Sequence, residues 1–436
     1  MDKLSFDLSK PLTPFKILNA TNGGPWCKRH VNDQTRSNFN EYKAARIPYA
    51  RNHDANACHV YGGPFAHDIS VIFPDFEKDV ADPESYDFAC TDEAILTWLD
   101  AGTKTFFRLG QTIEHQIKKH DTLPPKDFQR WASVCEHIIR HYTEGWADGY
   151  ELDMEYWEIW NEPDLDGDDS DNKRTWGGMK SEFFDLYEIT AKHLKKCFPN
   201  LKIGGPALAW NEEWAEDFLC EMQKRNVPID FFSWHIYCTE PIQMMEKADR
   251  LKAFLDKYGY GYAESILNEW NYVKGWTDEF VDSIKTIQSA KGASFVMACI
   301  SEAQHSSIDI LMYYSTIPHI WCNAFDYYTY EVRKGYYPLY WYGMFYDMKG
   351  EIPSEEKIEN IYSLCGVGKD GKTLTVVTYY TDKENEPSKE IELDFKRAGE
   401  YEIYLLDKDT DGTIVATTKD IRFTIEPNSC IMIKEV

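Results

Sequence analysis

The sequence lacks the features that mark disulfide-rich, zinc-binding and membrane-spanning proteins. Its 11 cysteines form no Cys-x-x-Cys pair and no cysteine–histidine spacing typical of a metal site. No apolar run approaches the ~18–20 residues that cross a bilayer. Residues 1–7 show no basic segment followed by an apolar stretch, which argues against a secretory signal. We therefore expect free thiols, no membrane span and a cytoplasmic location.

Basic residues are also scarce. Lys and Arg together number 47 against 73 for Asp and Glu, which gives a formal net charge of −26 at pH 7. A surface of that sign repels the phosphates of nucleic acids and the heads of anionic lipids. The sequence contains no Lys/Arg run long enough to form a local basic patch. We therefore expect the protein to bind neither nucleic acid nor membranes.

Aromatic residues, by contrast, are abundant. They make up 15% of the chain, with 14 Trp and 28 Tyr. Aromatic rings stack on the faces of sugars and carry a polar edge, so the surplus fits a protein that handles carbohydrate. A large core together with an oligomer interface would explain the same surplus, and the chain could then be a homo-oligomer.

Between residues 15 and 350 short β-like runs alternate with amphipathic helical patterns. Helices are expected, among others, at residues 125–142, with proline in the first turn, and at residues 279–301. Eight strands separated by helices predict an α/β fold of the parallel (β/α)8 type, a TIM barrel. An open doubly wound sheet is the alternative, but no Gly-x-Gly-x-x-Gly follows the first strand. The eight runs are residues 15–19, 47–52, 105–109, 156–160, 201–205, 231–234, 265–267 and 308–313.

After residue 350 the pattern changes to short β-branched or aromatic runs separated by Lys, Asp and Gly. Asp370-Gly371 and Asp411-Gly412 are typical of hairpin turns. We therefore divide the chain into a (β/α)8 catalytic barrel at 15–350 and a small all-β, β-sandwich-like C-terminal domain at 351–436. Residues 1–14 are an N-terminal segment that could join the β domain through residues 4–8.

Two of the barrel strands end in an asparagine–glutamate pair beside tryptophan. The fourth run continues as YWEIWNEPD over residues 156–164, and the seventh as SILNEWN over residues 265–271. Catalytic groups of such barrels lie at the C-terminal ends of strands. A carboxyl group beside indole and away from water stays protonated and can act as a general acid, while a second, more hydrogen-bonded carboxylate can attack. Alternatively, each glutamate caps a helix or pairs with an arginine.

The segment WEIWNEP over residues 157–163 resembles the acid/base signature of clan A glycoside hydrolases. The wider sequence is similar to glycoside hydrolase family 39, the β-xylosidase and α-L-iduronidase family. The similarity covers most of residues 45–350 and is most specific at GGPA, residues 204–207, and VPIDF, residues 227–231. The β domain matches this family only in position and character.

The resemblance implies a retaining mechanism with two catalytic glutamates and no metal or organic cofactor. It makes Glu162 the general acid/base and Glu269 the nucleophile. It makes Asn161 the residue that binds the sugar 2-hydroxyl and Tyr237 the residue that hydrogen-bonds the nucleophile. Further substrate-binding positions matched by the resemblance are Arg51, His53 and His235. Arg51 and the Tyr237 hydroxyl would also keep Glu269 ionised by charge and hydrogen bonding.

Several positions depart from the family pattern, and we add three of them to the substrate-binding residues. Asp54 follows His53 where small residues are common, and Arg108 stands where relatives carry an acidic residue. Arg108 could pair with an acidic sugar or neutralise Asp54, and we favour the second. The eighth strand lacks the tryptophan that commonly floors the catalytic subsite, and Trp321 could supply that ring. Asn268 stands where threonine is usual.

The leading hypothesis is a retaining glycosidase that acts from the chain end on short β-linked oligosaccharides such as xylosides. The same mechanism on an arabinoside, galactoside or uronide, or as an endo-glycanase, is the enzymatic alternative. A catalytically silent, sugar-binding barrel is the alternative from a different class. A metal-dependent hydrolase is disfavoured because no His-x-His or His-Glu-x-x-His motif completes a site beside His53 and Asp54.

Overall fold

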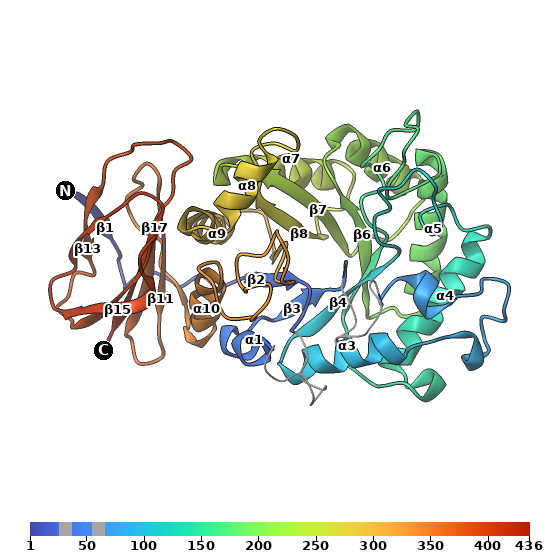
Figure 1. Cartoon of the computed structure of the whole chain (residues 1–436), viewed down its shortest axis with the longest axis horizontal. Helices are drawn as coiled ribbons and strands as arrows, with labels where there is room; N and C mark the ends of the chain where they lie inside the picture. The colour runs from blue at the N-terminus through green and yellow to red at the C-terminus, as the bar shows by residue number, and fades with distance from the viewer. Residues whose placement is uncertain (26–36, 55–65) are drawn as a thin grey trace.

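Eight parallel strands close into a barrel, the larger of two units in the molecule (Figure 1). The computed structural model describes residues 1–25, 37–54 and 66–436. Pairing of the first and last strands, with Thr21 opposite Tyr313, closes the barrel and confirms the predicted TIM fold. In barrel order the strands are β2 (Ile17–Asn22), β3 (Tyr49–Arg51), β4 (Lys104–Leu109), β5 (Tyr156–Ile159), β6 (Lys202–Leu208), β7 (Phe231–Cys238), β8 (Glu264–Tyr272) and β9 (Ile310–Tyr313).

The interior of the barrel changes from apolar to polar along the strands. Because strand side chains alternate between the two faces, residues two apart point the same way. An apolar layer fills the lower part and consists of Ala20, Tyr49, Phe106, Tyr156, Phe231, Ile266, Ile310 and Met312. Two residues further along four of these strands come Arg51, Arg108, Glu158 and Asn268, all buried. The strands therefore carry a packed floor with a polar layer above it at their C-terminal ends.

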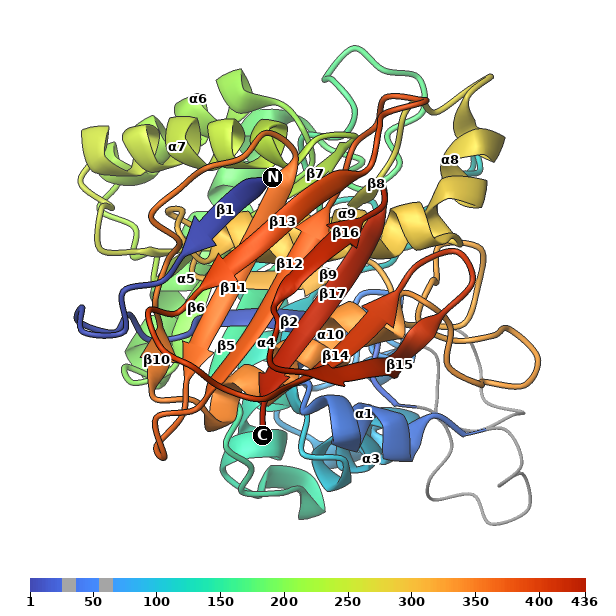
Figure 2. The ribbon, with the colours of Figure 1, turned by 90° about the vertical axis from the view of Figure 1, so that its left-hand side faces the viewer.

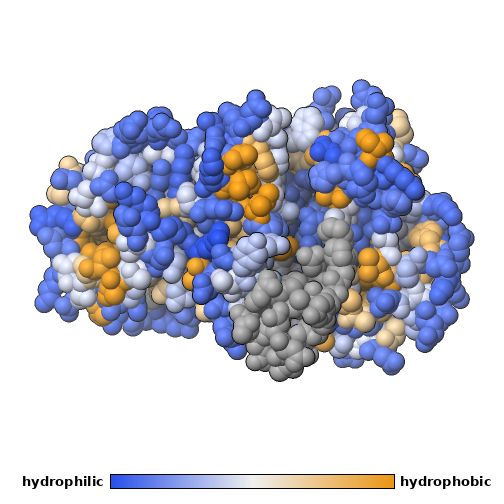
Figure 3. All heavy atoms as spheres, in the orientation of Figure 1, coloured by the Kyte–Doolittle hydropathy of each residue, from blue (hydrophilic) through white to orange (hydrophobic). Residues whose placement is uncertain are grey.

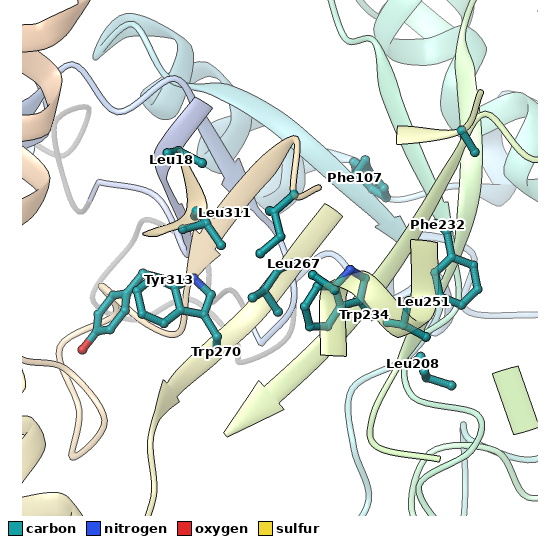
Figure 4. Close-up of a cluster of buried hydrophobic side chains, with 14 of the residues drawn as sticks. Leu18, Phe107, Leu208, Phe232, Trp234, Leu251, Leu267, Trp270, Leu311 and Tyr313 are labelled. Carbon is teal, nitrogen blue, oxygen red and sulfur yellow. The ribbon is translucent and has the colours of Figure 1, made fainter. Parts of the chain in front are cut away.

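The outer faces of the strands pack against helices. Figure 4 shows Phe232, Trp234 and Leu267 on β7 and β8 near Leu251 of an outer helix. Burying one such side chain contributes roughly 1.5–3 kcal/mol. The α-helices are α1 (Phe39–Ala45), α2 (Ile69–Ile72), α3 (Ala89–Asp100), α4 (Phe128–Thr143), α5 (Lys180–Cys197), α6 (Glu212–Lys224), α7 (Pro241–Lys257), α8 (Phe280–Ile287), α9 (Ala290–Ala303) and α10 (Tyr336–Met344).

Two helix predictions were wrong about where a helix begins, because a side-chain cap starts the helix at another residue. The helix predicted from residue 125 begins at Phe128, because the Asp127 side chain accepts the N–H of Arg130 as an N-cap. The single helix predicted over residues 279–301 is two helices, α8 and α9. The Ser289 side chain accepts the N–H of Lys291 and starts α9 separately.

A β domain of two sheets lies beside the barrel, on the left in Figure 1 and in front of the barrel in Figure 2. Side chains from both sheets, among them Leu4, Val377, Ile391 and Ile431, form one core, and α9 contacts the larger sheet. The larger sheet has the order β10 (Gly350–Glu351), β11 (Ile361–Val367), β12 (Thr373–Tyr379), β17 (Ser429–Glu435), β14 (Tyr401–Leu406) and β15 (Asp411–Thr418). The smaller has the order β1 (Asp2–Ser5), β13 (Lys389–Asp394) and β16 (Arg422–Ile425). The predicted all-β C-terminal domain is confirmed.

The N-terminal strand β1 pairs in parallel with β13, with Asp2 opposite Ile391. Of the two predicted hairpin signals, Asp370-Gly371 forms the turn between β11 and β12, and Gly371 takes a φ of +83° there. Asp411-Gly412 instead lies at the start of β15. The turn before β15 is held by the Asp407 carboxylate, which accepts the N–H groups of Asp409 and Thr410.

The surface in Figure 3 is hydrophilic over most of this face, with separate hydrophobic patches, as the net charge of −26 leads one to expect. In the part of the chain that the structure describes, every helix is too short or too polar to span a bilayer.

Candidate active site

Glu162 and Glu269 meet at the C-terminal mouth of the barrel. Glu162 follows β5 and Glu269 lies in β8, and one carboxylate oxygen of each lies within 4.8 Å of the other and of a His235 ring nitrogen. Trp160 and Glu162 adopt left-handed backbone conformations, with φ of 71° and 49°. Such conformations are costly for residues with a Cβ and are concentrated at functional sites. Here they turn the chain so that Glu162 reaches the mouth.

A register irregularity in β8 aims Glu269 inward. The pairing of β8 with β9 shifts between Leu267 and Trp270, both of which pack in the outer core. The two residues between them, Asn268 and Glu269, both bond to inward-facing side chains. An extra residue in one strand produces this re-aiming of a side chain.

Glu269 is held by a hydroxyl group and a guanidinium group. The Tyr237 hydroxyl donates to Oε1 at 2.6 Å, and Nη1 of the fully buried Arg51 lies 3.3 Å from Oε2. Burial raises the pKa of Glu269 to about 7, while the charge of Arg51 and the Tyr237 hydrogen bond oppose that rise. The environment therefore allows Glu269 to be ionised near neutral pH.

Glu162 is the more protonated of the two. Its Oε1 lies 2.8 Å from Nδ1 of His235, and its side chain remains 12% exposed. Burial, followed by the charge of Asp164, raises the pKa of Glu162 to about 8. Burial lowers the pKa of His235 to about 4, so the ring is neutral at pH 7. A protonated Glu162 beside an ionised Glu269 is the charge state that a general acid and a nucleophile require.

Arg51 connects the glutamates to Asn161. Its Nε donates to the Glu158 carboxylate at 2.7 Å and its Nη2 donates to the side-chain oxygen Oδ1 of Asn161 at 2.6 Å. The Nδ2 group of Asn161 is buried and has no hydrogen-bond partner among the described residues. Because a buried donor without a partner is destabilising, this amide is poised to bind a ligand.

Arg108 and Asp54, which depart from the family pattern, have separate partners. The Arg108 ion pair is with Asp68, at 2.7 Å, and Asp54 instead accepts the hydroxyl of Tyr314, at 3.1 Å. Arg108 thus pairs directly with Asp68, while its charge still lowers the pKa of Asp54 against the rise caused by burial, in keeping with the expected neutralisation. Nε2 of His53 lies 3.5 Å from Oδ2 of Asp54.

Trp321 lies against the tyrosines of the site. Its ring centroid is 5.6 Å from that of Tyr237 and 6.1 Å from that of Tyr314. A pocket of about 400 Å³ opens here; its lining includes Asp54, Thr112, His115, Tyr314, His319 and Trp321.

Four further residues of the site were missed by the sequence reasoning. Glu158 bonds Arg51, and Asp164 accepts three backbone N–H groups, from Ala209, Trp210 and Asn211. Lys247 donates to the carbonyl of His235 at 2.8 Å. Trp276, 60% exposed, places its ring 5.1 Å from that of Tyr237. Only Glu158 carried a signal in the sequence, as a charged residue inside an apolar strand.

Two groups of side chains in the described ranges have the spacing of metal ligands. The first is the Glu162–His235–Glu269 cluster itself. The second is Glu136, His193 and Cys197 on α4 and α5. Glu136 is already paired with Arg140 at 2.8 Å, and burial raises the pKa of the Cys197 thiol, so this second cluster is built as an ion-pair network.

A (β/α)8 barrel with two adjacent carboxyl groups at the ends of β5 and β8 defines the class of barrel glycoside hydrolases. The family model described as "Glycosyl hydrolases family 39" matches residues 26–300. The chain belongs to glycosyl hydrolase family 39, as its sequence resemblance predicted.

Individual relatives agree with this assignment. The chain is 30% identical over 194 residues to a beta-xylosidase of Geobacillus stearothermophilus, a match that covers 42% of this chain and 36% of that protein. A glucosidase from Croceicoccus marinus has a similar fold, with a TM-score of 0.78, 21% identity and coverage of 100% and 99%. A monomeric beta-xylosidase from Caulobacter crescentus CB15 does too, with a TM-score of 0.70, 14% identity and coverage of 100% and 99%. The sequence match thus spans about a third of the length of the curated relative, whereas the fold match spans nearly the full length of both solved structures.

Proposed function

We propose that the protein is a retaining glycoside hydrolase of the β-xylosidase type. The observation that carries the proposal is the separation of the catalytic pair, whose nearest carboxylate oxygens lie within 4.8 Å. Retaining enzymes hold their carboxyl groups about 5–5.5 Å apart, whereas inverting enzymes leave about 6.5–9.5 Å for a water molecule. Glu162 and Glu269 fit the first class.

The reaction proceeds in two displacements. Glu162 protonates the glycosidic oxygen while the Glu269 carboxylate attacks the anomeric carbon, so the leaving alcohol departs and a glycosyl ester of Glu269 forms. Glu162, now ionised, then takes a proton from water. The water oxygen attacks the anomeric carbon, the ester bond breaks, and both glutamates return to their first state. Two inversions at one carbon give overall retention.

The substrate we propose is a short β-linked oligosaccharide cleaved from its end, with a xyloside as the first choice. The beta-xylosidase relative supports this choice, and the glucosidase with the similar fold makes a glucoside the first alternative. We also propose a cytoplasmic location, which the nine free cysteines of the described ranges support. A homo-oligomer stays a prediction, to be tested by light scattering of the purified protein.

Initial rates on a panel of 4-nitrophenyl glycosides test the proposed function. The panel comprises the β-D-xyloside, α-L-arabinoside, β-D-glucoside, β-D-galactoside, β-D-glucuronide and α-L-iduronide. We expect one β-glycoside to dominate, and NMR of the first product to show the β-anomer. Inactivity on the whole panel and on β-linked oligosaccharides, from folded protein, would support the sugar-binding alternative instead.

The pH dependence of kcat/KM should be bell-shaped with its maximum between about pH 7 and 8. The free enzyme must carry an ionised Glu269, so activity rises as the pH passes the pKa of about 7 of that residue. It must also carry a protonated Glu162, so activity falls as the pH passes the pKa of about 8 of that residue. Because the two carboxyl groups interact, the pKa values read from the two limbs of the profile belong to the pair and not to either residue alone. A rate that is independent of pH across this range would contradict the assignment.

The variant Tyr237→Phe tests the acidic limb. The hydroxyl of Tyr237 lowers the pKa of Glu269, so its loss should raise that pKa and move the acidic limb to higher pH. A charge-assisted hydrogen bond of this kind makes about a 10-fold loss in kcat/KM a reasonable expectation. The matched control is Tyr260→Phe, which removes a buried hydroxyl that donates to the Val227 carbonyl. Its profile should equal that of the wild type.

A further inference from the structure

Asp54 presents an unused acceptor at the active-site pocket. One of its oxygens, Oδ2, accepts the hydroxyl of Tyr314 at 3.1 Å and lies 3.5 Å from Nε2 of His53. The other, Oδ1, is buried and has no hydrogen-bond partner among the described residues. A buried carboxylate oxygen without a donor is costly, and native proteins keep such atoms where a ligand satisfies them.

The position of Asp54 places this acceptor beside the reacting groups. Asp54 lies three residues after Arg51, whose guanidinium contacts the nucleophile Glu269. Its partner Tyr314 follows β9 and has its ring centroid 6.4 Å from that of Tyr237, which bonds the same nucleophile. Asp54 and Tyr314 both line the pocket of about 400 Å³. The charge of Asp54 also acts on Glu162, so its free oxygen lies near the reacting groups.

The charges around Asp54 favour a hydroxyl group over a carboxylate as the ligand. Arg108 is only 1% exposed and its Nη2 donates to Asp68, while its Nε and Nη1 are buried without a partner among the described residues, behind the lining of the pocket. Asp68 is fixed further by the backbone N–H and the hydroxyl of Thr112. Burial lowers the pKa of His53 and of the nearby His67, and both rings are neutral. Burial raises the pKa of Asp54 and the charge of Arg108 opposes that rise; of these side chains, Asp54 is the one that lines the pocket.

We propose that Asp54, held by the Tyr314 hydroxyl, accepts a hydrogen bond from a hydroxyl of the sugar in the catalytic subsite and makes this subsite select neutral sugars over uronic acids. The proposal rests on the proposed glycosidase function and narrows its substrate class. The hydroxyl concerned is one other than the 2-hydroxyl, which we assign to the Nδ2 group of Asn161, unpartnered among the described residues. A uronic acid would bring its carboxylate toward that of Asp54 and meet like-charge repulsion.

A deoxy-sugar series tests the proposal. The wild type, Asp54→Ala and Asp54→Asn are compared by kcat/KM on the best 4-nitrophenyl β-glycoside of the panel and on its 2-deoxy, 3-deoxy and 4-deoxy analogues. We expect Asp54→Ala to lose about 10- to 100-fold on the parent, as for a hydrogen bond to a charged group. On the one analogue that lacks the bound hydroxyl, the same variant should lose no more than about threefold. The 2-deoxy analogue serves as internal control and should show the full loss.

Two further measurements complete the design. Tyr314→Phe keeps the Asp54 carboxylate but removes the hydroxyl that holds it. We expect this variant to lose less kcat/KM than Asp54→Ala and to depend on the deoxy analogues in the same way. The β-glucuronide should be a poor substrate for the wild type, and Asp54→Ala should raise its rate relative to the neutral sugar. Equal losses on the parent and on all deoxy analogues, or no loss, would overturn the inference while leaving the glycosidase in place. A wild type inactive on every glycoside would refute the proposed function and this inference together.

Discussion

Replacing Glu269 by alanine should lower kcat on aryl glycosides by about 10⁴-fold or more. The carboxylate that forms the glycosyl ester is lost, and the remaining site can only bind the sugar and protonate the leaving oxygen. Glu269 lies above the apolar floor of the barrel with its side chain 9% exposed, so its removal opens space at the mouth and leaves that floor intact. We therefore expect a folded, inactive protein, checked by circular dichroism and by rates on the panel.

The matched control for this variant is Glu264→Ala. Glu264 begins the same strand, β8, at the opposite end of the barrel, where it pairs with Lys202 at 2.6 Å. That variant should retain the activity of the wild type. Added azide should rescue Glu269→Ala by attacking the anomeric carbon from the empty side, which gives the α-glycosyl azide. A Glu269→Ala protein with more than about one per cent of the wild-type rate would contradict the double displacement.

Replacing Glu162 by alanine should produce a loss that depends on the leaving group. General acid catalysis is worth about 10²–10⁴-fold, and it matters most when the departing alcohol is a poor leaving group. We expect that range of loss on a β-linked disaccharide and much less on the first step with a 2,4-dinitrophenyl glycoside. The measurement is kcat/KM across a series of aryl leaving groups, where the slope against leaving-group pKa should steepen.

Azide provides the second readout for Glu162→Ala. With the base removed, the glycosyl ester on Glu269 should accumulate, and azide should release it as the β-glycosyl azide. Glu213→Ala, on the outer helix α6, is the control and should behave as the wild type. Equal losses with good and poor leaving groups, without azide rescue, would show that Glu162 acts otherwise than as the acid/base.

Local patterns in the sequence predicted the barrel strands and the two glutamates. Each strand is a short apolar run, and Glu162 and Glu269 are visible because they break such runs beside asparagine. The contacts that tune them were not predictable in this way. Arg51 on β3 reaches past β4 to Glu158 on β5, and Arg108 on β4 reaches Asp68 in the loop before that strand, so both pairs depend on tertiary packing.

The errors in the secondary structure have a related cause. The break between α8 and α9 depends on one hydrogen bond of Ser289, and apolar periodicity continues through it. The turn at Asp407 depends on carboxylate bonds to two backbone N–H groups, whereas the Asp-Gly pair a few residues later resembled the stronger turn signal. Periodicity places elements well, but side-chain capping decides where they end.

The pairing of β1 with β13 gives the chain an order of assembly. The barrel is built from consecutive β–α units and can form progressively as the chain is synthesised, whereas β1 waits for a partner nearly the whole chain away. Until then the buried Leu4 and Phe6 are exposed, and the smaller sheet lacks one edge. Strand β1 can therefore join the β domain only after every residue of the barrel has been made.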